Sequence, residues 1–166
     1  LFLALSLSKQ SPTMSLGTFS PAGPFETRLF INGEFVASAD GKKFKTINPA
    51  TEAVICEVEE AGAADVDAAV VAATEAFKTW RKTNPSTRRD LLLKLADLVE
   101  ANKEYLACLE TLDNGKPFKN GGYSSFEGDL NLVLNCLRYY AGWAEKFCGK
   151  TIPVDGEFLS FTKIEP

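Results

Sequence analysis

Cysteines are the side chains of this chain best suited to act as nucleophiles or metal ligands, and they occur at positions 56, 108, 136 and 148. No two of them form a C-x-x-C pair, and the 166 residues include no histidine. This spacing argues against a structural zinc site and against a disulfide framework. Cys136 stands between Leu134 and Leu137 in an apolar helical pattern, without a neighbouring base or positive centre. We therefore expect Cys136 to be a buried, unreactive thiol.

The carboxylates and glycines form no complete catalytic or phosphate-binding motif. Glu110 and Asp113 stand three residues apart, which places them on one face of a helix. A solvated helix face explains such a pair better than acid–base catalysis, and we interpret Glu59 and Glu60 in the same way. Gly121-Gly122 follows no predicted strand, so it is predicted to be a loop. The motifs G-x-G-x-x-G and G-x-x-x-x-G-K-[ST] are absent.

Four helices are predicted to position these side chains. The first begins near Ala64, and the second begins at Pro85-Ser86, with Ser86 as its N-cap. Apolar residues recur at helical spacing in both segments, which predicts a buried stripe on each helix. The stripe of the first helix consists of Val66, Ala69, Val70, Ala73, Phe77 and Trp80. The stripe of the second consists of Leu91, Leu92, Leu95, Leu98 and Val99.

The third and fourth helices have clear stop signals. The third covers Asn102 to Asp113, where Asn114-Gly115 supplies a left-handed cap and Pro117 forbids continuation. The fourth is predicted from Ser125 to Cys148, with Gly149 as its stop. Its buried stripe is predicted to contain Leu130, Val133, Leu134, Leu137, Ala141 and Ala144.

Short strands are predicted on either side of the helices. Asn32-Gly33, a dipeptide typical of a type I′ turn, separates the strands Leu29–Ile31 and Glu34–Val36. Further strands are predicted at Lys43–Ile47, Val54–Val58, Lys150–Val154 and Phe158–Ile164, the last two around Asp155-Gly156. Hairpins flanking four helices indicate an α+β fold. These hairpins are too small to be stable alone, so we expect them to lie on the helices.

Composition and charge exclude some classes of function. Hydrophobic residues make up 45% of the chain and the net charge is −4, which is typical of a soluble globular protein and not of a nucleic-acid binder. The segment LFLALSLS has no preceding basic residue, and residues 1–28 contain just Lys9 and Arg28 as basic residues. Neither a secretory signal nor an Arg-rich presequence is evident. We predict a cytoplasmic protein without membrane attachment, with a mitochondrial location as the alternative.

The two ends of the chain lack the usual features of a complete reading frame. The chain starts with Leu1, its single methionine is Met14, and it stops at Pro166 directly after a predicted strand. We expect translation to start at Met14 and the sequence to be cut at both ends. Residues 1–28 are rich in Ser, Pro and Gly without any period, so they are predicted to be disordered or loosely attached.

A series of segments, taken together, resembles the NAD(P)-dependent aldehyde dehydrogenase family from about Leu29 to Pro166. The segments follow the family's order: LFINGEFV, TINPAT, VICEVEEA, ADVDAAV, LLLKLADLVE, LETLDNGKP, CLRYYAGWAEK and KTIPVDGEF. The resemblance implies an α/β fold with a Rossmann-like NAD(P) domain, a catalytic domain and a β oligomerisation arm. Residues 29–149 would then be the N-terminal part of the NAD(P) domain, and residues 150–166 would be the start of the arm.

The resemblance also implies a reaction and a few site residues. Family members oxidise an aldehyde to a carboxylic acid with NAD or NADP, through a cysteine thiohemiacetal and a glutamate that activates water. None of the four cysteines matches the nucleophile's motif, so no catalytic or cofactor-binding residue is carried over. A monovalent cation site is implied at Thr46, Ile47 and Asp113, and a wall of the substrate tunnel at Gly128 and Leu132.

Two functions follow from these expectations. The first is an N-terminal fragment of a homo-oligomeric aldehyde dehydrogenase, inactive by itself. The alternative is a truncated, non-catalytic interaction module that pairs with full-length subunits through its exposed terminal strand. The resemblance leaves open the preferred aldehyde, the choice between NAD and NADP, and dimer versus tetramer.

Overall fold

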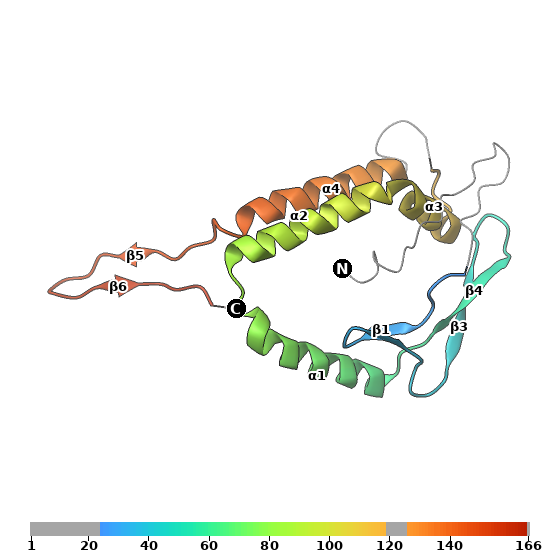
Figure 1. The fold of residues 1–166 in the computed structure, drawn as a ribbon, viewed down its shortest axis with the longest axis horizontal. Coiled ribbons are helices and arrows are strands. Elements are labelled where there is room, and N and C mark those ends of the chain that lie inside the picture. The colour runs from blue at the N-terminus through green and yellow to red at the C-terminus, as the bar shows by residue number, and fades with distance from the viewer. Residues whose placement is uncertain (1–23, 119–125, 166) are drawn as a thin grey trace.

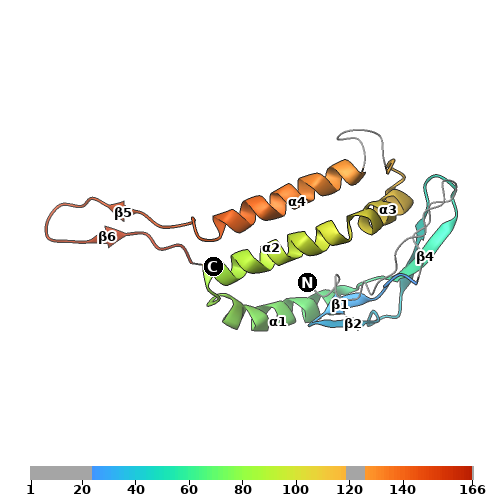
Figure 2. The ribbon, with the colours of Figure 1, turned by 45° about the horizontal axis from the view of Figure 1, so that its top comes forward.

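The computed structural model describes residues 24–118 and 126–165, and in these residues the chain has an α+β architecture (Figure 1). Helices α2 and α4 lie side by side, the first strands gather at one end of the molecule, and a thin two-stranded arm projects from the other (Figures 1 and 2). The elements in chain order are β1 (Leu29–Ile31), β2 (Glu34–Val36), β3 (Lys43–Ile47), β4 (Val54–Glu59), α1 (Ala63–Trp80), α2 (Pro85–Ala101), α3 (Lys103–Asn114), α4 (Phe126–Trp143), β5 (Thr151–Ile152) and β6 (Ser160–Phe161).

The described strands form three separate antiparallel pairs, β1–β2, β3–β4 and β5–β6. The turn of the first pair confirms the sequence prediction, because Asn32 and Gly33 both have positive φ angles, of 52° and 83°. A type I′ turn requires this conformation at both central residues, and asparagine and glycine adopt it most easily. Above the turn, the rings of Phe30 and Phe35 lie 5.0 Å apart across the two strands.

Two buried carboxylates hold the loop between β2 and β3. The backbone N–H of Ser38 donates to Glu59 Oε2 (2.9 Å), and Lys43 Nζ lies 3.1 Å from Glu59 Oε1. The backbone N–H of Ala39 donates to Asp65 Oδ1 at 3.0 Å. The interpretation of Glu59 as a solvated side chain is therefore wrong, although its neighbour Glu60 is exposed. Burial is tolerated because both carboxylate oxygens of Glu59 are paired.

Residues 24–28 are attached to the same region. Of the segment that was predicted to be loose, residues 1–28, the structure describes Pro24 onwards. The backbone N–H of Glu59 donates to the carbonyl oxygen of Thr27 at 3.0 Å, which fixes this part of the chain beside the end of β4. The prediction of loose attachment does not hold for these last residues.

The core lies where α2, α3 and α4 meet. Its fully or almost fully buried side chains are Ala96, Ala107, Cys108, Leu134 and Ala141. Three of the five are alanines, so the helix backbones approach closely there, while the leucines of α2 flank the contact and are half-buried or exposed. The predicted core positions Leu134 and Ala141 are confirmed, but Ala96 takes the central place on α2 in place of the leucines.

Several local predictions require correction. The N-cap of α2 is Asn84 and not Ser86, because Pro85 occupies the first helical position, where its fixed φ and missing N–H are tolerated. Helix α4 ends at Trp143, before the predicted stop, and continues as a turn through Lys146. Gly149 instead lies at the base of the β5–β6 arm, so close to the carbonyl oxygen of Thr162 that a Cβ atom has no room there.

The predicted buried stripe of α1 is largely exposed. Val66, Val70, Phe77 and Trp80 retain between 40% and 58% of their accessible surface. Helix α1 lies apart from the α2–α4 pair in Figure 1, and it packs mainly against β1. None of the helices in the described residues is long and apolar enough to cross a membrane.

Candidate functional site

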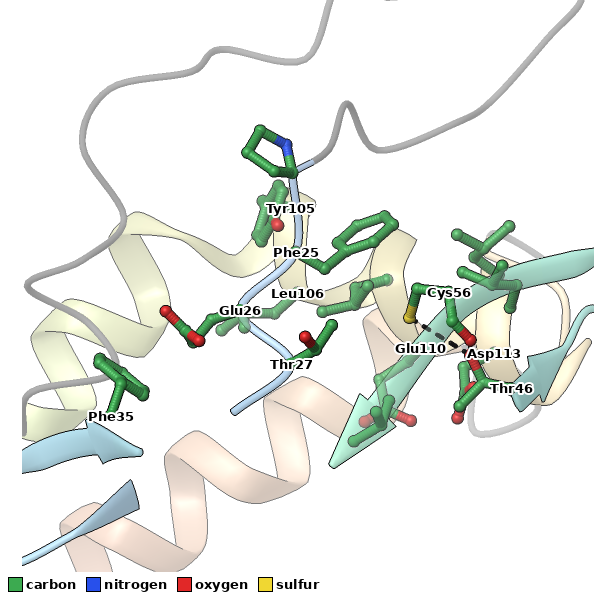
Figure 3. Close-up of a pocket in the computed structure, with 15 residues that line it drawn as sticks. Phe25, Glu26, Thr27, Phe35, Thr46, Cys56, Tyr105, Leu106, Glu110 and Asp113 are labelled. Atoms are coloured by element: carbon green, nitrogen blue, oxygen red, sulfur yellow. Dashed lines mark hydrogen bonds between the residues drawn. The ribbon is translucent and has the colours of Figure 1, made fainter. Parts of the chain in front are cut away.

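A cavity of about 370 Å³ lies between α3, the β3–β4 hairpin and residues 24–27 (Figure 3). Its walls are mainly apolar, with Leu106 and Leu109 from α3 and Ile55 from β4. Polar groups also line it, among them Glu110 and Asp113. A mainly apolar cavity with a few convergent polar groups is the usual form of a small-ligand site.

Helix α3 presents both carboxylates to this cavity. Glu110 and Asp113 both line it, which confirms that they share one face of the helix. Neither forms an ion pair within the described residues. Glu26, also in the wall, is different, since Arg28 holds it with two side-chain hydrogen bonds of 2.8 and 2.7 Å. These hydrogen bonds lower the pKa of Glu26 to about 2.

The end of α3 is fixed against the turn that follows β3. Gly115 caps α3 in the left-handed conformation, with φ 80° and ψ 0°, as predicted. A Cβ atom at Gly115 would lie 2.8 Å from Cγ of Pro49, so glycine is required here both for its φ and for the close approach. This contact brings the segment LDNGKP against TINPAT, two stretches that are far apart in the sequence.

The implied cation site is only partly gathered in this cavity. Thr46 and Asp113 line it, whereas the side chain of Ile47 is exposed and does not. The Thr46 hydroxyl lies 3.4 Å from both the carbonyl oxygen and the thiol of Cys56, the contact drawn as a dashed line in Figure 3. The described residues contain no group of three or more His, Cys, Asp or Glu side chains arranged to hold a metal ion.

The cysteines occupy different environments. Cys108 is completely buried in the helical core, and burial, followed by the nearby charge of Glu104, raises the pKa of its thiol to about 11. It therefore stays protonated at neutral pH and is a poor nucleophile. Cys136 is exposed on α4, so its predicted burial is wrong: Leu134 is on the buried side of the helix, and Cys136, two residues later, lies outside it. Cys148 is also exposed, and Cys56 is half-buried in the cavity wall.

The two tunnel residues do not belong to this cavity. Gly128 and Leu132 lie one turn apart on α4, where Gly128 is half-buried and Leu132 is 46% exposed. Sequence reasoning also missed two aromatic wall residues, Phe25 and Tyr105. Tyr105 continues the helical spacing of Leu109 and Leu112, a signal that was available. Phe25 stands in a segment without any period, so no pattern marked it.

Comparison with known proteins gives one consistent result. The model of the aldehyde dehydrogenase family matches residues 35–166. The mitochondrial aldehyde dehydrogenase of Rattus norvegicus is 46% identical over 177 residues, covering 98% of this chain and 33% of the relative. Cytosolic aldehyde dehydrogenase 1 of Elephantulus edwardii is 52% identical over 143 residues, covering 84% of this chain and 28% of the relative.

Solved structures agree with the sequence relatives. The structure of PnpE in complex with nicotinamide adenine dinucleotide superposes with a TM-score of 0.78 at 38% identity, over 84% of this chain and 28% of that protein. The present chain thus spans about a third or less of the length of the relatives it matches. Its helices and small antiparallel sheets agree with part of their fold.

Proposed function

The chain belongs to the aldehyde dehydrogenase family, and from this we propose that it forms the N-terminal part of an enzyme that oxidises an aldehyde to a carboxylic acid with NAD or NADP. The match over residues 35–166, with relatives about half identical in sequence, is the observation that carries the proposal. The relatives' names include both mitochondrial and cytosolic enzymes. For this chain we retain the cytoplasm as the proposed location and the mitochondrion as the alternative.

The chemical step itself falls to other parts of the proposed enzyme. A bound nicotinamide cofactor would accept the hydride of the aldehyde carbon. The described residues do not fit that cofactor, because the chain has no glycine-rich phosphate turn between a strand and a helix. They also lack an activated nucleophile, since Cys108 is buried and protonated and no histidine is present to act as a base for any cysteine. We therefore propose that this chain is inactive by itself.

We assign a supporting role to the cavity. Thr46, Ile47 and Asp113 would hold a monovalent cation, with backbone carbonyls of the turn and the Asp113 carboxylate as ligands. The contact between Gly115 and Pro49 supports this, because it fixes the end of α3 against the turn after β3. A rigid link of this kind would hold the Asp113 carboxylate close to the turn after β3 even when no ion is bound.

Gly128 and Leu132 would form part of the wall of the aldehyde tunnel. Their spacing of four residues places them on one face of α4, and the exposed Leu132 side chain offers an apolar surface to a substrate. The β5–β6 arm would contribute to a homo-oligomer. Its projection from the helices and the exposure of Phe158 and Leu159, at 80% and 79%, support that role (Figure 1).

A chimera tests the proposal. Residues 35–166 would replace the matching segment of the rat mitochondrial enzyme, and reduction of NAD would be followed at 340 nm with a simple aliphatic aldehyde. We expect an active chimera and no activity above the no-protein control for the 166-residue chain alone. A folded but inactive chimera would contradict the proposal for the enzyme, and aldehyde oxidation by the chain alone would contradict its proposed inactivity.

A second candidate is the non-catalytic interaction module. Both β5 and β6 belong to a two-stranded sheet, so each has an unpaired edge, and Phe161 is 63% exposed beside it. Such an edge can add to a sheet of another subunit. When the chain is co-expressed with the tagged rat enzyme, we expect the chain to co-purify with it. A chain from which residues 150–166 are deleted should not co-purify. Absence of the chain from the purified enzyme would rule out this candidate for that partner.

A further inference from the structure

Two lysines at the ends of α3 bind the first turns of α4. Lys103 is the first residue of α3, and its Nζ donates to Asn131 Oδ1 at 2.8 Å. Lys116 follows the Gly115 cap, and its Nζ donates to Asp129 Oδ2 in an ion pair. The side chains of Lys116 and Asp129 are 30% and 35% exposed, so water screens their attraction less than it screens an ion pair on the open surface. These two contacts together form what we call the lysine clamp.

The lysine clamp lies in the same turns of α4 as the proposed tunnel residues. Gly128 and Leu132 are four residues apart and share one face of the helix. At about 100° per residue, Asp129 lies about 100° to one side of Gly128 and Asn131 about 60° to the other. The two contacts with α3 therefore hold α4 on both sides of the face that carries Gly128 and Leu132.

Apolar packing alone holds this part of α4 weakly. Among the described side chains of α4, the first buried one is Leu134, about two turns after the helix begins. Helix ends with few buried contacts open more readily than packed interiors. The base of the clamp is firmer, because Gly115, next to Lys116, lies so close to Pro49 that an added Cβ would be 2.8 Å from its Cγ. The clamp thus ties the start of α4 to the fixed end of α3.

We propose that Lys116, assisted by Lys103, is a positioning residue that aims Gly128 and Leu132 at the aldehyde and so sets the selectivity for its chain length. This inference rests on the proposed function, in which these two residues form part of the tunnel wall. The lysines act through α4 and do not touch the reacting atoms. A long aliphatic aldehyde fills the tunnel and depends on where its wall lies, whereas acetaldehyde is too short to do so. Loss of the clamp should therefore affect long aldehydes selectively.

Kinetics of the chimera with the rat enzyme test this selectivity. Lys116→Met keeps the apolar stem of the side chain and removes its charge. It should lower kcat/KM for hexanal roughly tenfold relative to acetaldehyde, the low end of what one apolar contact in a pocket contributes to discrimination. Arg138→Met is the matched control, because it removes a cation that pairs with Glu100 from the same helix, beyond Leu134. We expect the control to leave the ratio of hexanal to acetaldehyde unchanged.

A charge exchange and a measurement without activity complete the test. Lys116→Glu should lower the ratio at least as far as Lys116→Met, and Lys116→Glu with Asp129→Lys should restore it, because the ion pair forms again with its charges exchanged. In the 166-residue chain, Lys116→Met should speed hydrogen exchange of the amides of residues 130–133 on the order of tenfold and leave residues 138–143 unchanged.

The outcomes separate this inference from the proposed function. A folded but inactive chimera would contradict the proposed function, whereas the exchange experiment would still support or overturn the clamp. The inference is overturned if the chimera is active and Lys116→Met changes the ratio no more than Arg138→Met does. It is also overturned if exchange at residues 130–133 stays the same or rises equally along the whole of α4.

Discussion

Helices α1 and α4 carry similar apolar patterns but have opposite surroundings. On α4, which packs on α2 and α3, Leu134 and Ala141 are buried, whereas the stripe of α1 is about half exposed along its whole length. Both helices are 18 residues long, so length does not separate them. The difference is a partner: α4 packs on α2 and α3, whereas α1 packs mainly on the short strand β1. An apolar stripe shows that a helix needs a partner, and does not show that the chain provides one.

The largest change in stability is expected in the packed helix, α4. Leu134→Ala should lower the free energy of unfolding by about 2–5 kcal/mol, because it removes a buried side chain and leaves a cavity in the helical core. Val70→Ala on the exposed stripe of α1 should change it by less than about 0.5 kcal/mol. Urea unfolding followed by circular dichroism measures both, at a concentration where the chain is monomeric. Equal losses would mean that the two helices are equally well packed.

A smaller effect is expected where α3 meets the turn after β3. Gly115→Ala should destabilise the chain by about 1–3 kcal/mol, because φ is 80° and the added Cβ would lie 2.8 Å from Pro49. Gly142→Ala on α4 is the control, since its Cβ would meet just the flexible end of Lys146, at 3.7 Å. Helix propensity predicts a gain of up to about 1 kcal/mol there. Thermal melts of the two variants should therefore shift in opposite directions.

The smallest expected effect concerns Glu59 and depends on pH. The hydrogen bond from the Ser38 N–H, followed by the contact with Lys43, lowers the pKa of Glu59 below its usual value of 4.5. Its contribution to stability is therefore fully present above pH 4.5 and is lost as the pH falls through the lowered value. Glu59→Gln should lower the melting temperature at pH 7, and the difference from the parent chain should shrink as the pH falls below 4.5.

Glu60→Gln is the matched control for the pH experiment, because Glu60 is exposed and adjacent in sequence. We expect no change in the melting temperature for this variant at pH 7. A difference between parent and Glu59→Gln that stays constant from pH 7 to pH 3 would contradict the assigned role of the charged carboxylate. Glu59 and Asp65 anchor the loop next to the start of the exposed helix α1, so the same experiment reports on how firmly that end of α1 is held.

Sequence reasoning succeeded where one or two residues restrict the backbone. The turn at Asn32-Gly33 and the cap at Gly115 both have positive φ, and both follow from local sterics. It failed at Cys136, Glu59 and the end of α4. For Cys136 and Glu59 the outcome depends on which face meets another part of the chain, and a residue's own neighbours in the sequence do not contain that information.

The candidate site shows the same division. Glu110 and Asp113 were placed on one face by helix periodicity alone, and Thr46 was tied to Asp113 by family resemblance. The cavity between them required the tertiary structure, because residues 24–27, β3–β4 and α3 come from three distant stretches of chain. The turn at Asn32-Gly33, the left-handed cap at Gly115 and the helical spacing of the apolar residues could thus be predicted from the sequence, since these depend on steric and helical rules within a few residues. Which faces are covered, which carboxylate is buried and where a cavity remains were decided by long-range packing, because burial depends on the atoms that surround a side chain in space.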